Sequence, residues 1–170
     1  MQTVILTLDQ QQIDPTVVID DRGNYYIRRA ARAVLRDSSG RVALMHATKR
    51  GYYKLPGGGI EDGEEVKDAL ARELMEETGS EAIIQRDLGV VLEWRDTDKM
   101  HQVSYAFTVL KTDRLADPNF TQSELDEGFE VSWTADIDEA ILLVELKVAD
   151  ADIGLSFMAK RDSAILRAAK

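Results

Sequence analysis

Residues 65–78 form the segment that most restricts how this chain folds. At about 100° per residue, Val66, Leu70 and Leu74 fall on one side of a helix, within an arc of about 80°. Gly79 follows directly, at the position where a left-handed residue commonly ends a helix. We therefore expect a helix over this segment, with its apolar stripe packed against another layer of structure.

The same segment carries three glutamates close to its apolar stripe. Glu77 falls inside the apolar arc, Glu73 at its edge and Glu76 farther round the helix. Carboxylates that are partly withdrawn from water do not all stay ionised unless their charge is compensated. Arg72 can pair with Glu76 four residues later, but one arginine does not neutralise three acids. A hard divalent cation such as Mg²⁺ does, because it prefers oxygen ligands. A salt-bridged surface helix is the alternative.

A glycine-rich segment, LPGGGIEDGEE at residues 55–65, leads directly into this helix. Its three consecutive glycines, Gly57, Gly58 and Gly59, let backbone groups approach a ligand closely. The N-terminus of a helix also favours anions. The segment therefore suits a loop that meets an anionic ligand, and an ordinary tight loop is the alternative.

The remaining segments predict a sheet with helices. Segments with the apolar pattern of β-strands occupy residues 16–20, 25–37, 41–47, 83–94 and 103–110. We expect the strand at 83–94 to break near Gly89. Two further helices are expected at 136–144 and 151–170. The second of these has an apolar stripe of Ile153, Phe157, Ile165 and Leu166. Strands mixed with helices predict an α/β layered domain.

Composition excludes several classes of protein. The 170 residues, of which 44% are hydrophobic and 31% charged, fit one domain over residues 1–170. No apolar run is long enough to cross a bilayer, and the N-terminus lacks a signal-peptide pattern. The chain has no cysteine, which excludes disulfides, thiolate metal ligands and cysteine nucleophiles. We therefore expect a cytoplasmic protein with no membrane partner.

The net charge of −10 argues against a nucleic-acid polymer as partner, because such polymers are bound by a basic face. A small phosphorylated ligand is compatible with this charge, because a metal ion can reverse the local sign of the field.

Fixed spacings join the glycine loop to the acidic helix. Gly58 is followed after five residues by Glu64, and after seven more by RELMEETG at residues 72–79. This arrangement resembles the Nudix box, the signature of the Nudix hydrolase family. Ser80 departs from the pattern, because the family usually has an aliphatic residue there. The resemblance covers about residues 25–145 and implies an α/β fold, a Nudix-like α/β/α sandwich with a mixed β-sheet.

The resemblance implies hydrolysis of a diphosphate linkage with Mg²⁺ or Mn²⁺ as cofactor. Glu73, Glu76 and Glu77 are implied as metal ligands, and the carbonyl of Gly57 as a further ligand. The attacking water then loses its proton to a carboxylate. The resemblance leaves this general base open among Glu76, Glu73 and Glu127, the last of which lies outside the box.

Four other residues have supporting roles by the same resemblance. Arg72 is implied to hold the glutamates in place, next to the catalytic chemistry. Glu64 is implied to brace the loop against the helix. Gly58 and Gly79 are implied to be structural, at the loop and at the end of the helix.

Contacts to the substrate come from outside the box. Arg28, Arg32 and Lys54 surround it and are candidates to bind phosphates, although a solvated surface charge is the alternative for each. Tyr53 and Trp94 are candidates to stack on a nucleobase. For Tyr53, packing within its loop is the alternative.

The substrate is narrowed only by elimination. Secondary signatures that resemble those of the ADP-sugar, coenzyme A, NADH and dinucleoside polyphosphate subfamilies are absent. A nucleoside triphosphate, normal or oxidised, remains, giving a nucleoside monophosphate and pyrophosphate. A nucleotide-sugar or dinucleotide diphosphatase, and a non-catalytic nucleotide sensor on the same fold, are the alternatives. The partner is then a small-molecule nucleotide, and a homodimer is left open.

Overall fold

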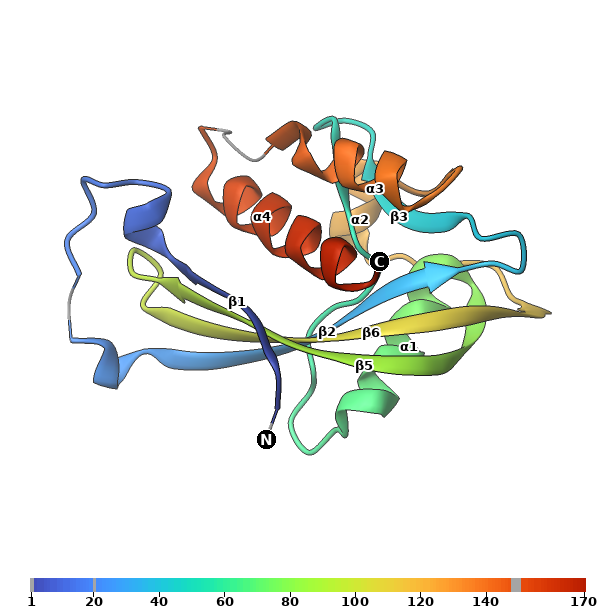
Figure 1. Ribbon diagram of the computed structural model, residues 1–170, viewed down its shortest axis with the longest axis horizontal. Coiled ribbons are helices and arrows are strands. Elements are labelled where there is room, and N and C mark those ends of the chain that lie inside the picture. The colour runs from blue at the N-terminus through green and yellow to red at the C-terminus, as the bar shows by residue number, and fades with distance from the viewer. Residues whose placement is uncertain (1, 20, 148–150) are drawn as a thin grey trace.

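The computed structural model describes residues 2–19, 21–147 and 151–170. A mixed β-sheet lies between helices on its two faces (Figure 1). Its strands are β1 (Val4–Asp9), β2 (Tyr26–Arg36), β3 (Val42–Ala47), β4 (Tyr52–Lys54), β5 (Ser80–Arg95), β6 (Met100–Leu115) and β7 (Phe129–Thr134). Their order is β1-β5-β6-β2-β3-β4, and β7 also pairs with β3. The β1–β5 and β2–β6 pairs are parallel, and the others are antiparallel.

The α-helices come mainly from the second half of the chain. They are α1 (Val66–Thr78), α2 (Gln122–Glu127), α3 (Ile137–Val144) and α4 (Ile153–Ala168). Short 3₁₀ helices occupy Gln10–Gln12, Arg22–Asn24 and Glu145–Lys147. Within the described ranges, no helix has both the length and the apolar character that a membrane span needs.

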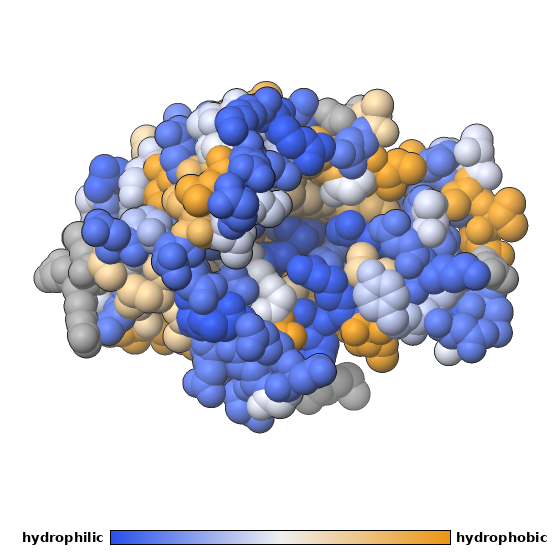
Figure 2. All heavy atoms as spheres, turned by 180° about the vertical axis from the view of Figure 1, so that it is seen from behind, coloured by the Kyte–Doolittle hydropathy of each residue, from blue (hydrophilic) through white to orange (hydrophobic). Residues whose placement is uncertain are grey.

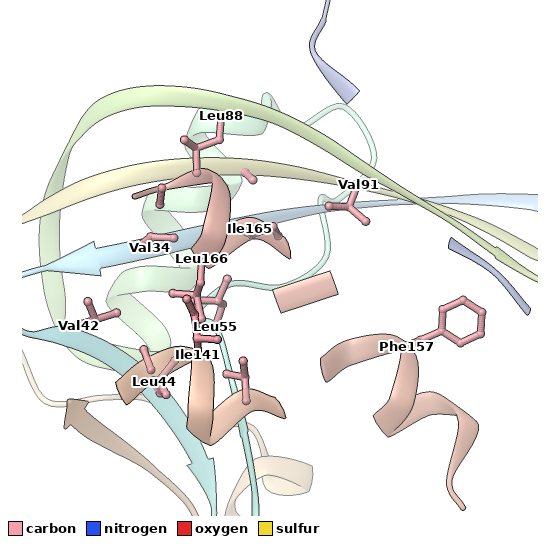
Figure 3. Packing of buried hydrophobic residues seen from close by; sticks show 14 of the residues in the cluster. Val34, Val42, Leu44, Leu55, Leu88, Val91, Ile141, Phe157, Ile165 and Leu166 are labelled. Carbon is pink, nitrogen blue, oxygen red and sulfur yellow. The ribbon is translucent and has the colours of Figure 1, made fainter. Parts of the chain in front are cut away.

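Strand β2 shows how the layers are built, because successive strand side chains point to opposite faces. On one face, Ala31, Ala33 and Leu35 join a buried cluster with the apolar stripe of α1. On the other face, Val34 joins a second buried cluster with Phe157 and other side chains of α3 and α4 (Figure 3). Helix α1 therefore covers one face and helices α3 and α4 the other. The expected α/β/α sandwich with a mixed sheet is confirmed.

The sheet opens between β2 and β3, and the glycine loop enters this opening. The two strands pair at a single position, at one end of β2. Farther along β2, the loop takes the place of a neighbouring strand: the N–H groups of Ala31 and Ala33 donate to the carbonyls of Gly58 and Pro56, both at 3.0 Å. The loop is thereby fixed beside β2, the strand that carries Arg28 and Arg32.

Most elements expected from the sequence are confirmed. Helices α1, α3 and α4 lie within the segments predicted at 65–78, 136–144 and 151–170. The predicted strands at 25–37, 41–47, 83–94 and 103–110 correspond to β2, β3, β5 and β6. The expected break in β5 is also present, because Gly89 has φ +112° and the β5–β6 register shifts between Asp87 and Gly89.

The strand predicted at residues 16–20 is wrong for its described residues, 16–19; residue 20 lies outside the described ranges. The Asp14 carboxylate accepts hydrogen bonds from the N–H group of Thr16 at 2.9 Å and from its hydroxyl at 2.6 Å, which turns the chain locally. Val18 is 84% exposed, so its apolar side chain packs against no sheet. Strands β1, β4 and β7 and helix α2 were not predicted, because each is short.

Candidate active site

Helix α1 presents its glutamates at three different depths. Gly79 ends the helix in the left-handed region, at φ 60°, and its N–H group donates to the carbonyl of Met75. The side chains of Glu77, Glu73 and Glu76 are 2%, 14% and 41% exposed. This order is the one expected from their positions on the helix, with Glu77 inside the apolar arc.

Arg72 joins the glutamates to the glycine loop. Its Nε and Nη2 atoms donate to the two carboxylate oxygens of Glu64, at 2.9 and 3.0 Å. Its Nη1 donates to Glu73 at 3.0 Å and to Glu76 at 3.2 Å, and its Nη2 also donates to the carbonyl of Gly59 at 2.9 Å. The hydrogen bonds from Arg72 lower the pKa of Glu64 below its ordinary value. One guanidinium therefore links the helix to the loop.

Glu77 is a buried carboxylate with two partners from the loop side. It accepts a hydrogen bond from Lys54 Nζ at 2.7 Å and another from the N–H group of Gly57 at 2.6 Å. Gly57 has φ +122°, and a Cβ atom there would overlap the carbonyl of Ala31 on β2. Only glycine fits this position without a shift of the backbone, so the loop depends on it.

Glu73 lies between Glu77 and the second glycine of the loop. Burial raises the pKa of Glu73, the charge of Glu77 raises it further, and the hydrogen bond from Arg72 acts in the opposite direction. A Cβ atom on Gly58 would overlap the carboxylate of Glu73. The missing side chain at Gly58 thus leaves the space in which this carboxylate lies.

Two adjoining clefts surround these groups. The first has a volume of about 460 Å³, and we call it the glutamate cleft because its lining includes Glu61, Glu73, Glu76, Glu77 and Glu124. The second, of about 420 Å³, is the arginine cleft, whose basic lining residues are Arg28, Arg32, Arg50, Lys54, Arg95 and Arg161. Arg28, Arg32 and Lys54 line both clefts. Figure 2 shows hydrophilic side chains inside a hollow near the middle of one face.

The glutamates match a hard divalent cation by donor type. All three acids on α1 offer carboxylate oxygens, which Mg²⁺ and Mn²⁺ accept as ligands. Among the described residues, however, no group of three acidic, histidine or cysteine side chains is already gathered for a metal ion. The carboxylates contact Arg72, Lys54 and the N–H group of Gly57 instead. A cation would compete with these partners for oxygens that the fold has already brought to one cleft.

The acid predicted downstream of the box is not part of the glutamate cleft lining. Glu127, at the end of α2, accepts a hydrogen bond from the hydroxyl of Tyr52 at 2.6 Å and lies 3.7 Å from Arg50. Burial and this hydrogen bond raise the pKa of Tyr52. Glu124, one turn earlier, lines the cleft instead. Its capping box with Thr121 is a signal that the sequence carries in the letters TQSE.

The predicted basic residues reach the clefts, whereas the predicted aromatic residues do not. Tyr53 is stacked on His46 with ring centroids 4.2 Å apart, and Trp94 is stacked on His101 at 3.9 Å. Neither Tyr53 nor Trp94 is among the residues that line the two clefts. The structure thus gives no support for base stacking by these two side chains.

Comparison with known proteins identifies the family of this chain. Residues 26–153 match the family model described as the NUDIX domain. The uncharacterized Nudix hydrolase YvcI of Bacillus subtilis (strain 168) is 34% identical over 100 residues, which cover 58% of this chain and 62% of YvcI. The nucleoside triphosphatase NudI of Escherichia fergusonii is 39% identical over 56 residues, or 33% of this chain and 37% of NudI. The matched segments thus span less than two thirds of either relative.

The solved structures show the same fold. The solution structure of the E. coli ORF135 protein superposes with a TM-score of 0.58 at 21% identity, covering 87% of this chain and 96% of that one. The family match extends over most of the chain, ends at residue 153 and includes the glycine loop, the glutamates of α1 and the strand that carries Arg28 and Arg32. This chain belongs to the Nudix hydrolase family.

Proposed function

We propose that this chain is a metal-dependent hydrolase that cleaves a diphosphate linkage in a nucleoside diphosphate joined to another group. A nucleoside triphosphate, normal or oxidised, is the proposed substrate, giving a nucleoside monophosphate and pyrophosphate. The observation that carries the proposal is the meeting of three α1 glutamates with the basic side chains of Arg28, Arg32, Lys54 and Arg72 in the glutamate cleft. The name of NudI, a nucleoside triphosphatase, supports the choice of substrate.

In this proposal Glu73, Glu76 and Glu77, with the carbonyl of Gly57, hold the cation. A bound Mg²⁺ or Mn²⁺ would neutralise phosphate oxygens and lower the pKa of the attacking water. The side chains of Arg28, Arg32 and Lys54, which line both clefts, would bind the phosphates and set their orientation.

Glu76 is our candidate for the general base. Its side chain is 41% exposed and, among the described residues, makes one ion pair, to Arg72 at 3.2 Å, so it is open to an attacking water. Glu73 is the alternative on the same helix. Glu124 is a further candidate, because it lines the glutamate cleft. Glu127 is less suited as a general base, because its carboxylate already accepts a hydrogen bond from the hydroxyl of the buried Tyr52.

Replacing Arg72 with lysine is expected to lower kcat/KM by about 10- to 100-fold, the usual effect of losing a group that orients metal ligands. Lysine keeps the charge but cannot reproduce the forked contact with Glu64 and the bonds to the two glutamates. Steady-state kinetics with Mg²⁺ measure the effect. Arg41→Lys is the control, because Arg41 is 55% exposed and pairs with Asp37, away from both clefts. Equal rates for the two variants would contradict the role of Arg72.

A substrate screen tests the proposed function. The purified protein is incubated with Mg²⁺ and with nucleoside triphosphates, oxidised triphosphates, nucleotide sugars and dinucleotides, and the released phosphates are analysed. We expect the highest turnover with a triphosphate. If a nucleotide sugar or a dinucleotide is turned over faster than every triphosphate, that compound class becomes the substrate and the triphosphate assignment is wrong. Tight nucleotide binding without turnover of any diphosphate compound would identify a sensor instead.

Three broader points belong to the same proposal. We propose that residues 1–170 act as a single domain, because the second buried cluster joins β1 to α4 across the sheet. A small-molecule nucleotide is the proposed partner, and a nucleic-acid polymer is not, in view of the net charge of −10. A cytoplasmic location and a homodimer remain predictions.

A further inference from the structure

The arginine cleft concentrates positive charge in a chain whose net charge is −10. Among the residues that the structure describes, six basic side chains line it, against a single acidic residue, Asp152. Asp152 forms an ion pair with Arg50 at 2.7 Å, so its charge is already engaged. Because three of the six basic residues also line the glutamate cleft, the cationic region begins beside the proposed reaction site. Such a cleft attracts anions and focuses the field on them.

Two of these guanidinium groups have unused hydrogen-bonding capacity. Arg32 is 5% exposed and the side chain of Arg95 is 15% exposed, yet the Nε atom of each has no partner within the described part of the chain. Across the same residues, neither Arg28 nor Arg32 forms an ion pair with a carboxylate; Arg28 donates to the side-chain oxygen of Gln102. Burial, and then the charge of Arg161, lower the pKa of Arg32 to about 10. Arg95 is paired with Glu93 at 2.9 Å, so Arg32 is the buried cation of this group that an anion in the cleft would pair.

Arg161 is the member of the cleft that comes from α4, beyond the segment that matches the family model. It is 3% exposed, its Nε donates to Asp162 at 2.7 Å, and its Nη1 lies 3.9 Å from Glu93. Burial opposes its charge, but these two carboxylates outweigh burial and raise the pKa of Arg161. Asp162 also accepts a hydrogen bond from the N–H group of Leu55 at 2.9 Å, at the start of the glycine loop. Arg161 is therefore charged and held in a fixed position relative to that loop.

We propose that the arginine cleft binds a phosphate group that the substrate carries in addition to the diphosphate that is cleaved, and that Arg161 selects for this group. The inference rests on the proposed function and narrows its substrate class. A phosphate offers the negative charge that Arg28 and Arg32 lack among the described residues and an acceptor for the Nε atom of Arg32, in a geometry that guanidinium matches. A substrate without this phosphate leaves the Nε–H group of Arg32 without an acceptor in the described part of the chain. Such an unpaired donor discriminates between two substrates more strongly than the loss of an apolar contact does.

Matched pairs of substrates that differ by one phosphate test this directly. ATP with ADP, NADPH with NADH, and coenzyme A with dephospho-coenzyme A are three such pairs. In at least one pair, we expect kcat/KM to be about 10-fold higher for the member with the further phosphate. Arg161→Gln is expected to lower that value by about 10-fold and to change the value for the other member by less than about twofold. An equal loss for both members, or no preference in any pair, would overturn the inference.

Two variants guard against an effect of folding. Arg167→Gln is the matched control, because Arg167 lies on the same helix, is 56% exposed, pairs with Glu145 and does not line the cleft. It should leave both members of each pair unchanged. Arg50→Gln removes a cleft residue that is 43% exposed, so it is expected to fold. If Arg161→Gln melts at a lower temperature than Arg167→Gln, the inference is judged on Arg50→Gln instead. The quantity compared is then the ratio of kcat/KM values within each substrate pair.

Binding of inorganic tripolyphosphate in the presence of EDTA separates this inference from the proposed function. By calorimetry, the wild type is expected to bind one tripolyphosphate and Arg161→Gln to bind it about 10-fold more weakly, with Arg167→Gln unchanged. If the wild type hydrolyses no diphosphate compound, the proposed function fails, and this binding measurement alone decides the inference. Unchanged binding in both Arg161→Gln and Arg50→Gln would overturn it.

Discussion

Replacing Glu76 with glutamine is expected to lower kcat by about 10³-fold while the fold stays intact. Glutamine keeps the shape of the side chain but removes the charge that, in our proposal, holds the cation and accepts the proton. The side chain is 41% exposed, and its ion pair with Arg72 is one of several that Arg72 makes. Steady-state kinetics with Mg²⁺ and a thermal melt measure the two parts of the prediction.

Asp68→Asn is the matched control for Glu76→Gln. Asp68 is also an exposed acid on α1, but it lies in the first turn and lines neither cleft. Its replacement should leave kcat unchanged. Glu77→Gln should also abolish turnover, although the loss of a buried charge between Lys54 and Gly57 is expected to reduce stability as well. Unchanged turnover in both Glu76→Gln and Glu77→Gln would remove the basis for the metal site.

Replacing Gly57 with alanine is expected to lower the free energy of unfolding by at least about 3 kcal/mol. Two effects combine at this position. The backbone has φ +122°, which a residue with a Cβ rarely adopts, and that Cβ would overlap the carbonyl of Ala31 in β2. Any shift that relieves the overlap also disturbs the hydrogen bond from the N–H group of Gly57 to Glu77.

Gly63→Ala separates these two effects, because Gly63 lies in the same loop at φ +79° but has open space where a Cβ would be placed. It should cost only the conformational penalty of about 1–2 kcal/mol. Urea unfolding of both variants gives the comparison. Equal losses of stability would show that contact with β2 is not what makes Gly57 necessary.

The sequence predicted the helix and the loop because both depend on local rules. The period of 3.6 located α1 and its apolar stripe, and the same calculation placed Glu77 among buried residues, where it is 2% exposed. The three glycines were expected to let the backbone approach a ligand, whereas the close approach seen in the structure is between Gly57 and Ala31 of β2. The strands with a period of two were found for the same reason.

The parts that sequence reasoning missed depend on contacts between distant segments. Strand β1 pairs in parallel with β5, more than 80 residues later, and short strands carry little pattern of their own. Whether Glu124 or Glu127 reaches the glutamate cleft depends on how α2 is placed, which its six residues do not predict. The aromatic side chains of Tyr53 and Trp94 stack on His46 and His101, which lie on neighbouring strands. The sequence alone does not show which of these side chains come into contact.

Arg161 was not among the site residues predicted from the sequence, although its position in the sequence indicated a buried charge. It lies four residues after Phe157 and four before Ile165, inside the apolar stripe that predicted α4. Like Glu77, Arg161 is a charged residue on a buried helix face, where its charge needs a partner. Both residues are almost fully buried, at 2% and 3% exposure, and both line the clefts. A charge within an apolar stripe was thus the most informative pattern in this chain.

³¹P NMR of the reaction with the best substrate of the screen, first with Mg²⁺ and then with excess EDTA, decides whether the chain is a metal-dependent diphosphatase. We expect cleavage of the diphosphate linkage with Mg²⁺, which for a nucleoside triphosphate gives the monophosphate and pyrophosphate, and no turnover with EDTA. Turnover that continues unchanged in EDTA, or release of orthophosphate from the triphosphate in place of pyrophosphate, would contradict this expectation.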